Sequence, residues 1–338
     1  MALHIVHFEH QGRARWGVLR ENQIIPVPGH FATTGEFIRG TSHDELARLS
    51  GPGLAESEIK LLSPVTRNQQ FVCQGANYRQ HMIESGMDPD AKTFNMLFTK
   101  AQSCIVPADS ELVKPAHVRF LDYEIELGLV LKRELAHGLT VTRANLHEFI
   151  AGIVIVNDYS ARDVQLPQMQ FYKGKSYRTF GPVGPYLCLL DARDMPRLEQ
   201  LQLTLTVNGE VRQHDSTANL VFGPAETLTE LAGLQDLVAG DLIATGTPAG
   251  CALSIPSPRA QRIAALLPEK TKWELFMKTQ ARRTQYLKAG DRVESRIVSA
   301  DGSINLGVQR NRVVDESRGA HEHEARLRAI HSPGDGQP

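Results

Sequence analysis

The run of residues 120–131, which alternates acidic and apolar side chains, most constrains how this chain folds, because it predicts a β-strand. Asp122, Glu124 and Glu126 fall on one face of that strand, and the other face carries Leu121, Tyr123, Ile125, Leu127 and Leu129. The run is too apolar for an ordinary surface strand, and a buried carboxylate without a partner is very costly. Residues two apart on a strand lie about 6.5–7 Å from one another, so two of these carboxylates can bind one hard cation. A solvated sheet face lined with acids is the alternative interpretation.

A second apolar run, residues 150–156, predicts a buried strand that ends abruptly in polar residues. The residues that follow are Asn157, Asp158, Ser160, Arg162, Asp163 and Gln165. Functional sites are often built where a rigid strand passes into a loop. Asp158 is therefore a candidate for a third carboxylate on the same ion. The alternative is a capped turn with a weak Arg162–Asp163 surface pair.

These segments and four others resemble, in their order along the chain, the motifs of the fumarylacetoacetate hydrolase superfamily, in particular its acylpyruvase and 2-hydroxyhepta-2,4-diene-1,7-dioate isomerase branches. The motifs are G-A-N-Y-R-Q-H-M-I-E from Gly75, D-Y-E-I-E-L from Asp122, N-D-Y-S-A-R-D from Asn157, G-K-S-Y-R-T-F-G-P from Gly174, G-D-L-I-A-T-G-T-P-A-G from Gly240 and G-V-Q-R-N-R-V-V from Gly307. The resemblance covers residues 65–315. It implies a mostly β fold with some α-helix, in which a mixed sheet forms a β-roll, a distorted barrel or a sandwich, preceded by a small N-terminal β-rich domain.

The resemblance also assigns roles to the acids. It implies that Glu124, Glu126 and Asp158 hold a divalent metal ion, with Mg²⁺ as the expected ion and Mn²⁺ or Ca²⁺ as alternatives. It further implies a group of residues that contact or orient the substrate, namely Tyr78, Arg162, Gln165 and Thr247. The bland interpretation of Thr247 is a tight turn, which Gly246 and Pro248 would form anyway.

Residues 79–86 predict a short helix that ends at Gly86 and carries His81 and Glu84 on one face. A carboxylate beside an imidazole orients the ring and raises its basicity, which suits a general base. The resemblance implies that this pair activates the attacking water and that Lys175 stabilises developing negative charge. A structural histidine and a flexible surface lysine are the alternatives, with Lys173 as the competing position.

With these residues in place, the resemblance implies a Mg²⁺-dependent hydrolase that cleaves a carbon–carbon bond in an acylpyruvate or a related β-diketo or 2-oxo acid through a metal-bound enolate. The same enolate stabilisation serves a 2-oxo acid decarboxylase or a hydroxyheptadienedioate isomerase or hydratase. A non-catalytic binding protein on the same scaffold is the third hypothesis. Retention of the acids, His81 and Lys175 argues against it.

The composition agrees with an enzyme that acts on small-molecule substrates. The 338 residues carry a formal net charge of −1, which favours neither nucleic acid nor an anionic membrane as a partner. The apolar runs are too short to cross a bilayer, and the first residues lack the pattern of a secretory signal, so we expect a cytoplasmic protein. The four widely spaced cysteines are expected to be buried and reduced.

The expected organisation is a small β-rich domain over residues 1–64, a catalytic domain over 65–315 and a disordered tail over 316–338. Asn208-Gly209, between two strand-like runs, predicts a β-hairpin. Residues 85–103 are expected to form a long loop that resembles a mobile lid. Residues 252–288 form an insertion, with a candidate helix at 259–267, that is a lid, a contact of a homodimer or a solvated excursion.

Overall fold

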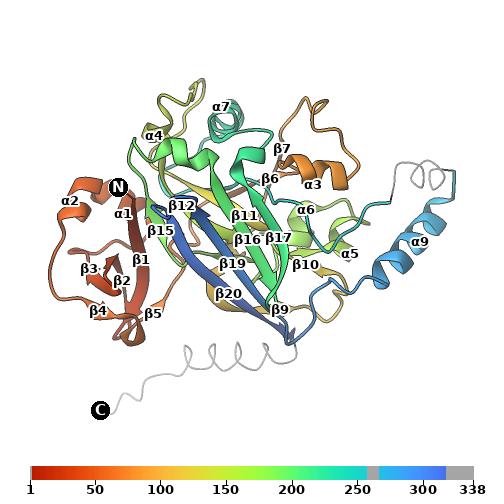
Figure 1. The fold of residues 1–338 in the computed structure, drawn as a ribbon, viewed down its shortest axis with the longest axis horizontal. Helices are drawn as coiled ribbons and strands as arrows, with labels where there is room; N and C mark the ends of the chain where they lie inside the picture. Colours follow the sequence, from red (N-terminus) through yellow and green to blue (C-terminus); the bar gives the residue numbers. More distant parts are fainter. Residues whose placement is uncertain (1, 257–265, 317–338) are drawn as a thin grey trace, which may run out of the picture.

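The computed structural model describes residues 2–256 and 266–316. Its two large β-sheets pack face to face, with a small two-stranded sheet and short helices around them (Figure 1). The mostly β class with some α-helix is confirmed. The strand order of each sheet has two ends within these described residues, so the sheets are open and form a sandwich rather than a closed barrel. None of the helices in these two ranges is long and apolar enough to cross a membrane.

The large sheet has the order β4-β3-β2-β1-β15-β12-β11-β18-β6-β7. Its strands are β4 (Leu54–Ala55), β3 (Gln23–Pro26), β2 (Arg13–Arg20), β1 (Leu3–His10), β15 (Leu187–Leu189), β12 (Ile150–Asn157), β11 (Ile125–Leu131), β18 (Leu242–Ala244), β6 (Phe71–Gly75) and β7 (Met96–Thr99), with β5 (Lys60–Leu61), β8 (Ile105–Pro107) and β14 (Gly181–Val183) beside this path. The second sheet runs β17 (Glu210–Ser216), β16 (Leu201–Val207), β19 (Arg292–Ser299), β20 (Asn305–Asp315) and β9 (Asp109–Lys114).

Short elements surround the sheets. A two-stranded ladder pairs β10 (Leu121–Asp122) with β13 (Ser160–Ala161). The α-helices are α1 (Thr34–Gly40), α2 (His43–Arg48), α3 (Arg79–Glu84), α4 (Leu146–Phe149), α5 (Arg162–Gln165), α6 (Phe171–Lys175), α7 (Pro224–Leu234) and α9 (Glu269–Ala281). Single 3₁₀ turns are η1 (Glu56–Glu58), η2 (Gln102–Cys104), η3 (Met195–Glu199) and η4 (Thr217–Asn219).

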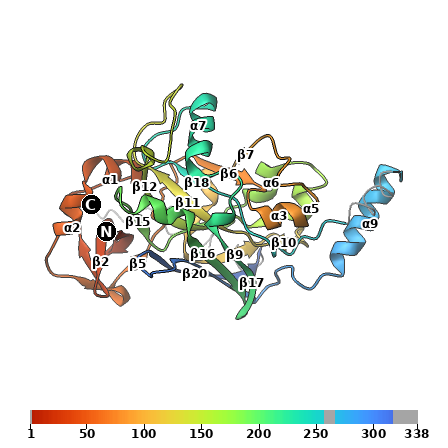
Figure 2. The ribbon, with the colours of Figure 1, turned by 45° about the horizontal axis from the view of Figure 1, so that its top comes forward.

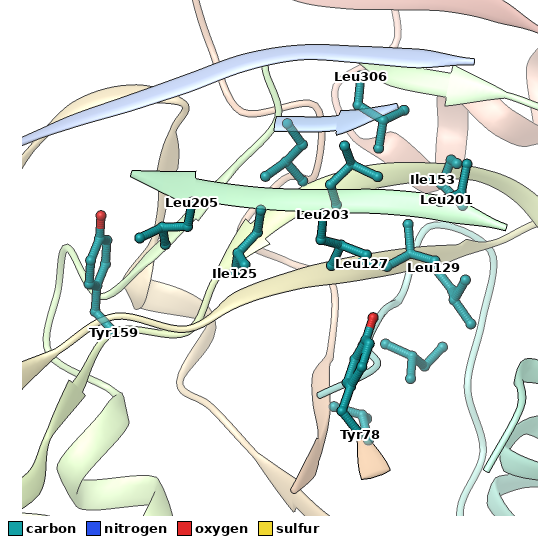
Figure 3. Packing of buried hydrophobic residues seen from close by; sticks show 14 of the residues in the cluster. Tyr78, Ile125, Leu127, Leu129, Ile153, Tyr159, Leu201, Leu203, Leu205 and Leu306 are labelled. Atoms are coloured by element: carbon teal, nitrogen blue, oxygen red, sulfur yellow. The ribbon is translucent and has the colours of Figure 1, made fainter. Parts of the chain in front are cut away.

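The main hydrophobic core lies between the two sheets (Figure 3). Alternate residues of β16, including Leu201, Leu203 and Leu205, face Ile125, Leu127 and Leu129 of β11 across this layer. Every residue of β11 and β12 is buried, because a second core cluster covers the opposite face of the large sheet. A side chain of β11 that points away from the leucines therefore remains inside the protein, and this is the environment of Glu126.

The predicted hairpin at Asn208-Gly209 is confirmed. β16 and β17 pair antiparallel up to Val207 and Glu210, and the two residues between them have φ values of 52° and 84°. Both central residues of a type I′ turn need a positive φ, which asparagine and glycine tolerate best. All four cysteines are buried and free, as predicted.

Residues 2–64, within the segment predicted as a small β-rich domain, contain β1–β5 and the helices α1 and α2. Their sheet continues into the large sheet, because β1 pairs antiparallel with β15 in a register that sets Leu3 opposite Leu189 and Ile5 opposite Leu187. Figure 1 shows these strands and helices, in red and orange, at one end of the large sheet.

Part of the predicted lid is regular structure. Met96–Thr99 is strand β7, which pairs with β6 at the edge of the large sheet, so the loop expected over 85–103 is shorter than predicted. The insertion over 252–288 contains α9, which stands away from the sheets in both views (Figures 1 and 2). The candidate helix over 259–267 and the tail over 316–338 lie largely outside the described residues.

Candidate active site

Two neighbouring strands bring the three predicted metal ligands together. β11 and β12 pair antiparallel with Glu126 opposite Val156, and the Asp158 amide donates to the Glu124 carbonyl at 2.8 Å. Glu124, Glu126 and Asp158 are all buried, and one carboxylate oxygen from each lies within 4.8 Å of the other two. The juxtaposition that the sequence predicts for these acids is therefore present.

The acidic segment is not one continuous strand, which corrects the prediction for residues 120–131. β10 ends at Asp122 and β11 begins at Ile125. The Glu124 amide donates to Asn157 Oδ1 at 3.0 Å and the Ile125 amide to Gln213 Oε1 at 3.1 Å. These side chains take the place of backbone ladder partners where Glu124 enters the site.

Two buried lysines pair with the carboxylates: both contact Asp158, and one of them also contacts Glu124. Lys175, at the end of α6, donates to Glu124 Oε2 at 2.7 Å, to Asp158 Oδ2 at 2.6 Å and to Ser160 Oγ at 2.8 Å. Lys100 follows β7, is fully buried, and donates to Asp158 Oδ1 and to the Phe180 carbonyl. Burial alone would lower the pKa of Lys175, but Asp158 and Glu124 raise it, so the ammonium stays charged.

Arg162 occupies the other side of Glu124. Its guanidinium donates through Nη2 to Glu124, through Nε to Asp122 at 2.9 Å and through Nη1 to Gln165 Oε1 at 2.8 Å. Burial by itself would raise the pKa of Glu124, but the charges of Arg162 and Lys175 lower it to about 2. Glu124 is therefore an anion with two fixed cationic partners.

Glu126 differs from the other two ligands. Its one hydrogen bond among the described residues comes from the Gly246 amide at 2.9 Å, and no lysine or arginine in those ranges forms an ion pair with it. Burial, followed by the charges of Asp158 and Glu124, raises its pKa well above the usual range. Of the acids that converge here, Glu126 is the one left without a cation.

The donor set fits a hard divalent cation. The buried carboxylates of Asp122, Glu124, Glu126 and Asp158 outnumber the three buried basic groups of Lys100, Lys175 and Arg162 by one. The three converging ligands offer only oxygen, which Mg²⁺, Mn²⁺ and Ca²⁺ prefer. A cation between them would give Glu126 the positively charged partner that it lacks among the described residues.

His81 and Glu84 lie on α3, as predicted, but no hydrogen bond joins them among the described residues. Glu84 is exposed and accepts from the Gly250 amide at 3.2 Å. His81 is half-buried, and its ring lies in the field of Glu124, Arg162, Glu84 and Asp122. Burial lowers the pKa of His81 more than the carboxylates raise it, so the imidazole is neutral near pH 7 and can accept a proton.

The residues predicted to contact substrate separate into two groups. Gln165 and Arg162 are hydrogen-bonded to each other beside Glu124. The Thr247 hydroxyl donates to the Ile125 carbonyl and accepts from Gln213, both at 2.9 Å, so it is already used within the protein. The backbone amide of Thr247 has no hydrogen-bond partner among the described residues. Tyr78 is fully buried in the main core (Figure 3), and within the described ranges its hydroxyl has no hydrogen-bond partner.

Three further residues support the site, and sequence reasoning gave none of them a role. Lys100 sits in a segment interpreted as a lid, and Asp122 shares the acidic face without joining the metal set. Gln213 lies on β17 of the second sheet and bonds to Ile125, Thr247 and Pro248.

A cavity of about 1400 Å³ lies away from this site. It is lined by residues within 140–147, 192–200 and 217–230, and none of the predicted site residues lines it.

Comparisons with known proteins agree with this arrangement. The family model described as fumarylacetoacetate (FAA) hydrolase C-terminal matches residues 70–314. The chain is similar to oxaloacetate tautomerase YisK of Bacillus subtilis, with 36% identity over 210 residues that cover 61% of this chain and 67% of that protein.

Solved structures of similar proteins match this fold over almost the whole chain. A fumarylacetoacetate hydrolase from psychrophilic Exiguobacterium antarcticum is similar with a TM-score of 0.70 and 30% identity, covering 93% of this chain and 100% of that one. A probable 2-hydroxyhepta-2,4-diene-1,7-dioate isomerase from Mycobacterium abscessus is similar with a TM-score of 0.69 and 28% identity, covering 94% and 99%. This chain, in which Glu124, Glu126 and Asp158 converge beside two buried lysines, therefore belongs to the fumarylacetoacetate hydrolase family.

Proposed function

We propose that this protein is a divalent-metal-dependent enzyme that interconverts the keto and enol forms of a 2-oxo dicarboxylic acid of the oxaloacetate class. The observation that carries the proposal is the convergence of Glu124, Glu126 and Asp158, with Lys175 bonded to two of these carboxylates and His81 on the neighbouring helix α3. Similarity to an oxaloacetate tautomerase and to a probable dioate isomerase supports the same class of chemistry.

Tautomerisation requires that one proton leave the carbon beside the ketone and that one proton reach the carbonyl oxygen. His81 is the group suited to accept the carbon-bound proton, because its ring is neutral near pH 7. The Lys175 ammonium is suited to stabilise the negative charge that develops on the oxygen. A divalent cation held by Glu124, Glu126 and Asp158 would act as a Lewis acid and orient the two oxygens of a 2-oxo acid.

Hydrolytic cleavage of an acylpyruvate is the second candidate function. The placement of His81 and Glu84 three residues apart on α3 favours it, since such a pair can activate water. Against it, Glu84 accepts from the Gly250 amide rather than from the histidine. Tautomerisation needs a proton acceptor but no oriented water, so this geometry supports it better.

The test compares oxaloacetate tautomerisation with acylpyruvate cleavage in the same preparation, with Mg²⁺ and with EDTA. We expect metal-dependent tautomerisation that falls about 10²–10⁴-fold in His81→Ala, the usual loss for a general base. Gln80→Ala, an exposed neighbour on α3, is the matched control and should keep the wild-type rate. Cleavage much faster than tautomerisation would favour the hydrolase, and full activity in EDTA would refute both candidates.

A further inference from the structure

Asp122 is a fully buried carboxylate that is surrounded by hydrogen-bond donors and is not one of the three converging ligands. Its Oδ1 accepts from the amides of Tyr123 at 2.9 Å and Ala252 at 2.7 Å. Its Oδ2 accepts from Arg162 Nε and from the Leu253 amide, both at 2.9 Å. Each carboxylate oxygen of Asp122 therefore accepts two hydrogen bonds.

Through Arg162, Asp122 reaches two residues of the active site. The guanidinium that Asp122 holds by Nε uses its other nitrogens to bind Glu124 and Gln165. Because a guanidinium is planar and its donors are fixed relative to one another, the position of Nε sets the positions of both Nη groups. Moving Arg162 away from Asp122 would change how strongly it holds Glu124, a predicted metal ligand.

Asp122 also fixes the base of the 252–288 segment, which carries α9. One end of the segment gives it the Ala252 and Leu253 amides. The other end returns to the same place, because Arg283 Nε donates to the Ala252 carbonyl at 2.6 Å and the Leu287 amide donates to the Leu121 carbonyl at 2.9 Å. The segment that stands out from the body in Figure 2 is therefore attached beside Asp122.

From these contacts we infer that Asp122 is a positioning residue. It holds Arg162 in the orientation that leaves Glu124 available to a divalent cation and Gln165 available to substrate, and it couples that orientation to the base of the α9 segment. The part that concerns metal and substrate rests on the proposed function, whereas the coupling to the α9 segment does not.

The test is Asp122→Asn in the full-length protein. Asparagine keeps the shape of the side chain, but its NH₂ group must face two of the four donors, so half of the contacts become repulsive. Asp241→Asn is the matched control. Asp241 is also buried among donors, the amides of Gln70 and Val238 and the side chain of Gln69, but it lies at the far end of β11.

Two measurements separate positioning from a general loss of stability. We expect Mg²⁺ affinity, measured by calorimetry, to fall about 10–100-fold in Asp122→Asn and to stay near wild type in Asp241→Asn. In EDTA, hydrogen–deuterium exchange should rise at residues 252–256 and 280–288 only in Asp122→Asn. In an Arg162→Gln background the Asp122→Asn change should have little further effect on Mg²⁺ affinity, because Asp122 acts through Arg162.

Equal Mg²⁺ affinities in the two asparagine variants, or additive effects of the changes at 122 and 162, would overturn the positioning role. A wild-type protein that binds no Mg²⁺ would refute the proposed function, while the exchange measurement would still test the coupling. If Asp122→Asn does not fold, Arg162→Gln carries that test. Arg162→Gln should then raise hydrogen–deuterium exchange at the Ala252 and Leu253 amides, although Arg162 makes no hydrogen bond to them among the described residues. Unchanged exchange at these two amides would overturn the coupling.

Discussion

Replacing two ligands of the same candidate metal site should change the stability of the metal-free protein in opposite directions. Asp158 is paired with Lys100 and Lys175, whereas Glu126 is paired with no base in the described residues and accepts one backbone hydrogen bond. Asp158→Asn leaves two buried ammonium groups short of a partner, and breaking a buried pair costs about 3–5 kcal/mol. Glu126→Gln removes a buried carboxyl group that the folded protein must keep protonated at a cost in stability, and it keeps an oxygen for the Gly246 amide, so it should gain about 1–3 kcal/mol.

Thermal unfolding in EDTA measures both effects. In a protein of this size about 1 kcal/mol corresponds to roughly 2 °C in Tm. We therefore expect Tm to fall by about 6–10 °C in Asp158→Asn and to rise by about 2–6 °C in Glu126→Gln. At a Mg²⁺ concentration about 100 times Kd, the wild-type protein should gain about 2.7 kcal/mol, and both variants should lose that gain.

The pH dependence provides a second check on the same residue. Because burial raises the pKa of Glu126 in the folded state, the folded protein keeps a proton that the unfolded chain loses near its ordinary value of 4.5. The stability of the metal-free protein should therefore fall as pH rises above that value, and the Glu126→Gln variant should lack this part of the fall. A loss of stability in Glu126→Gln as large as in Asp158→Asn, or a wild-type Mg²⁺ response in either variant, would refute the reasoning.

Three further outcomes can be measured. Lys175→Met should lower kcat for tautomerisation by about 10²–10³-fold, whereas Lys173→Met, at an exposed position two residues earlier, should not; equal effects would contradict the assignment. Gly246→Ala should destabilise the protein more than Gly290→Ala, as chemical denaturation would measure: both glycines have a positive φ, but an added Cβ lies 2.9 Å from Asn77 only at Gly246. We expect a homodimer, so sedimentation at micromolar concentration should give about 75 kDa, and the monomer mass of 37.4 kDa would contradict this.

The candidate metal ligands could be predicted from sequence because local patterns carry them. Alternation at period two places Glu124 and Glu126 on one face, and the polar end of an apolar run marks Asp158. The strand over Ile150–Asn157 and the hairpin at Asn208-Gly209 follow from equally local signals. These features need no knowledge of distant residues.

The features that sequence missed depend on distant partners. The break in the acidic strand requires side chains from Asn157 and Gln213, which are 33 and 88 residues from the amides that they bind. Lys100 lies 58 residues from Asp158, and no periodic pattern distinguishes it from a surface lysine. The open sandwich depends on which short strands pair at the ends of the large sheet, which is also non-local.

The continuity of the large sheet through β1 and β15 affects how the protein can be divided. β1 satisfies the outer edge of β15, and Ile5, Trp16 and Phe37 pack in the same core cluster as Leu187 and Val154. Removal of residues 1–64 would expose that cluster to solvent and leave the outer edge of β15 unpaired, and an unpaired strand edge is a template for aggregation. A chain with this large sheet but without residues 1–64 would need another segment, or a second subunit, to cover β15.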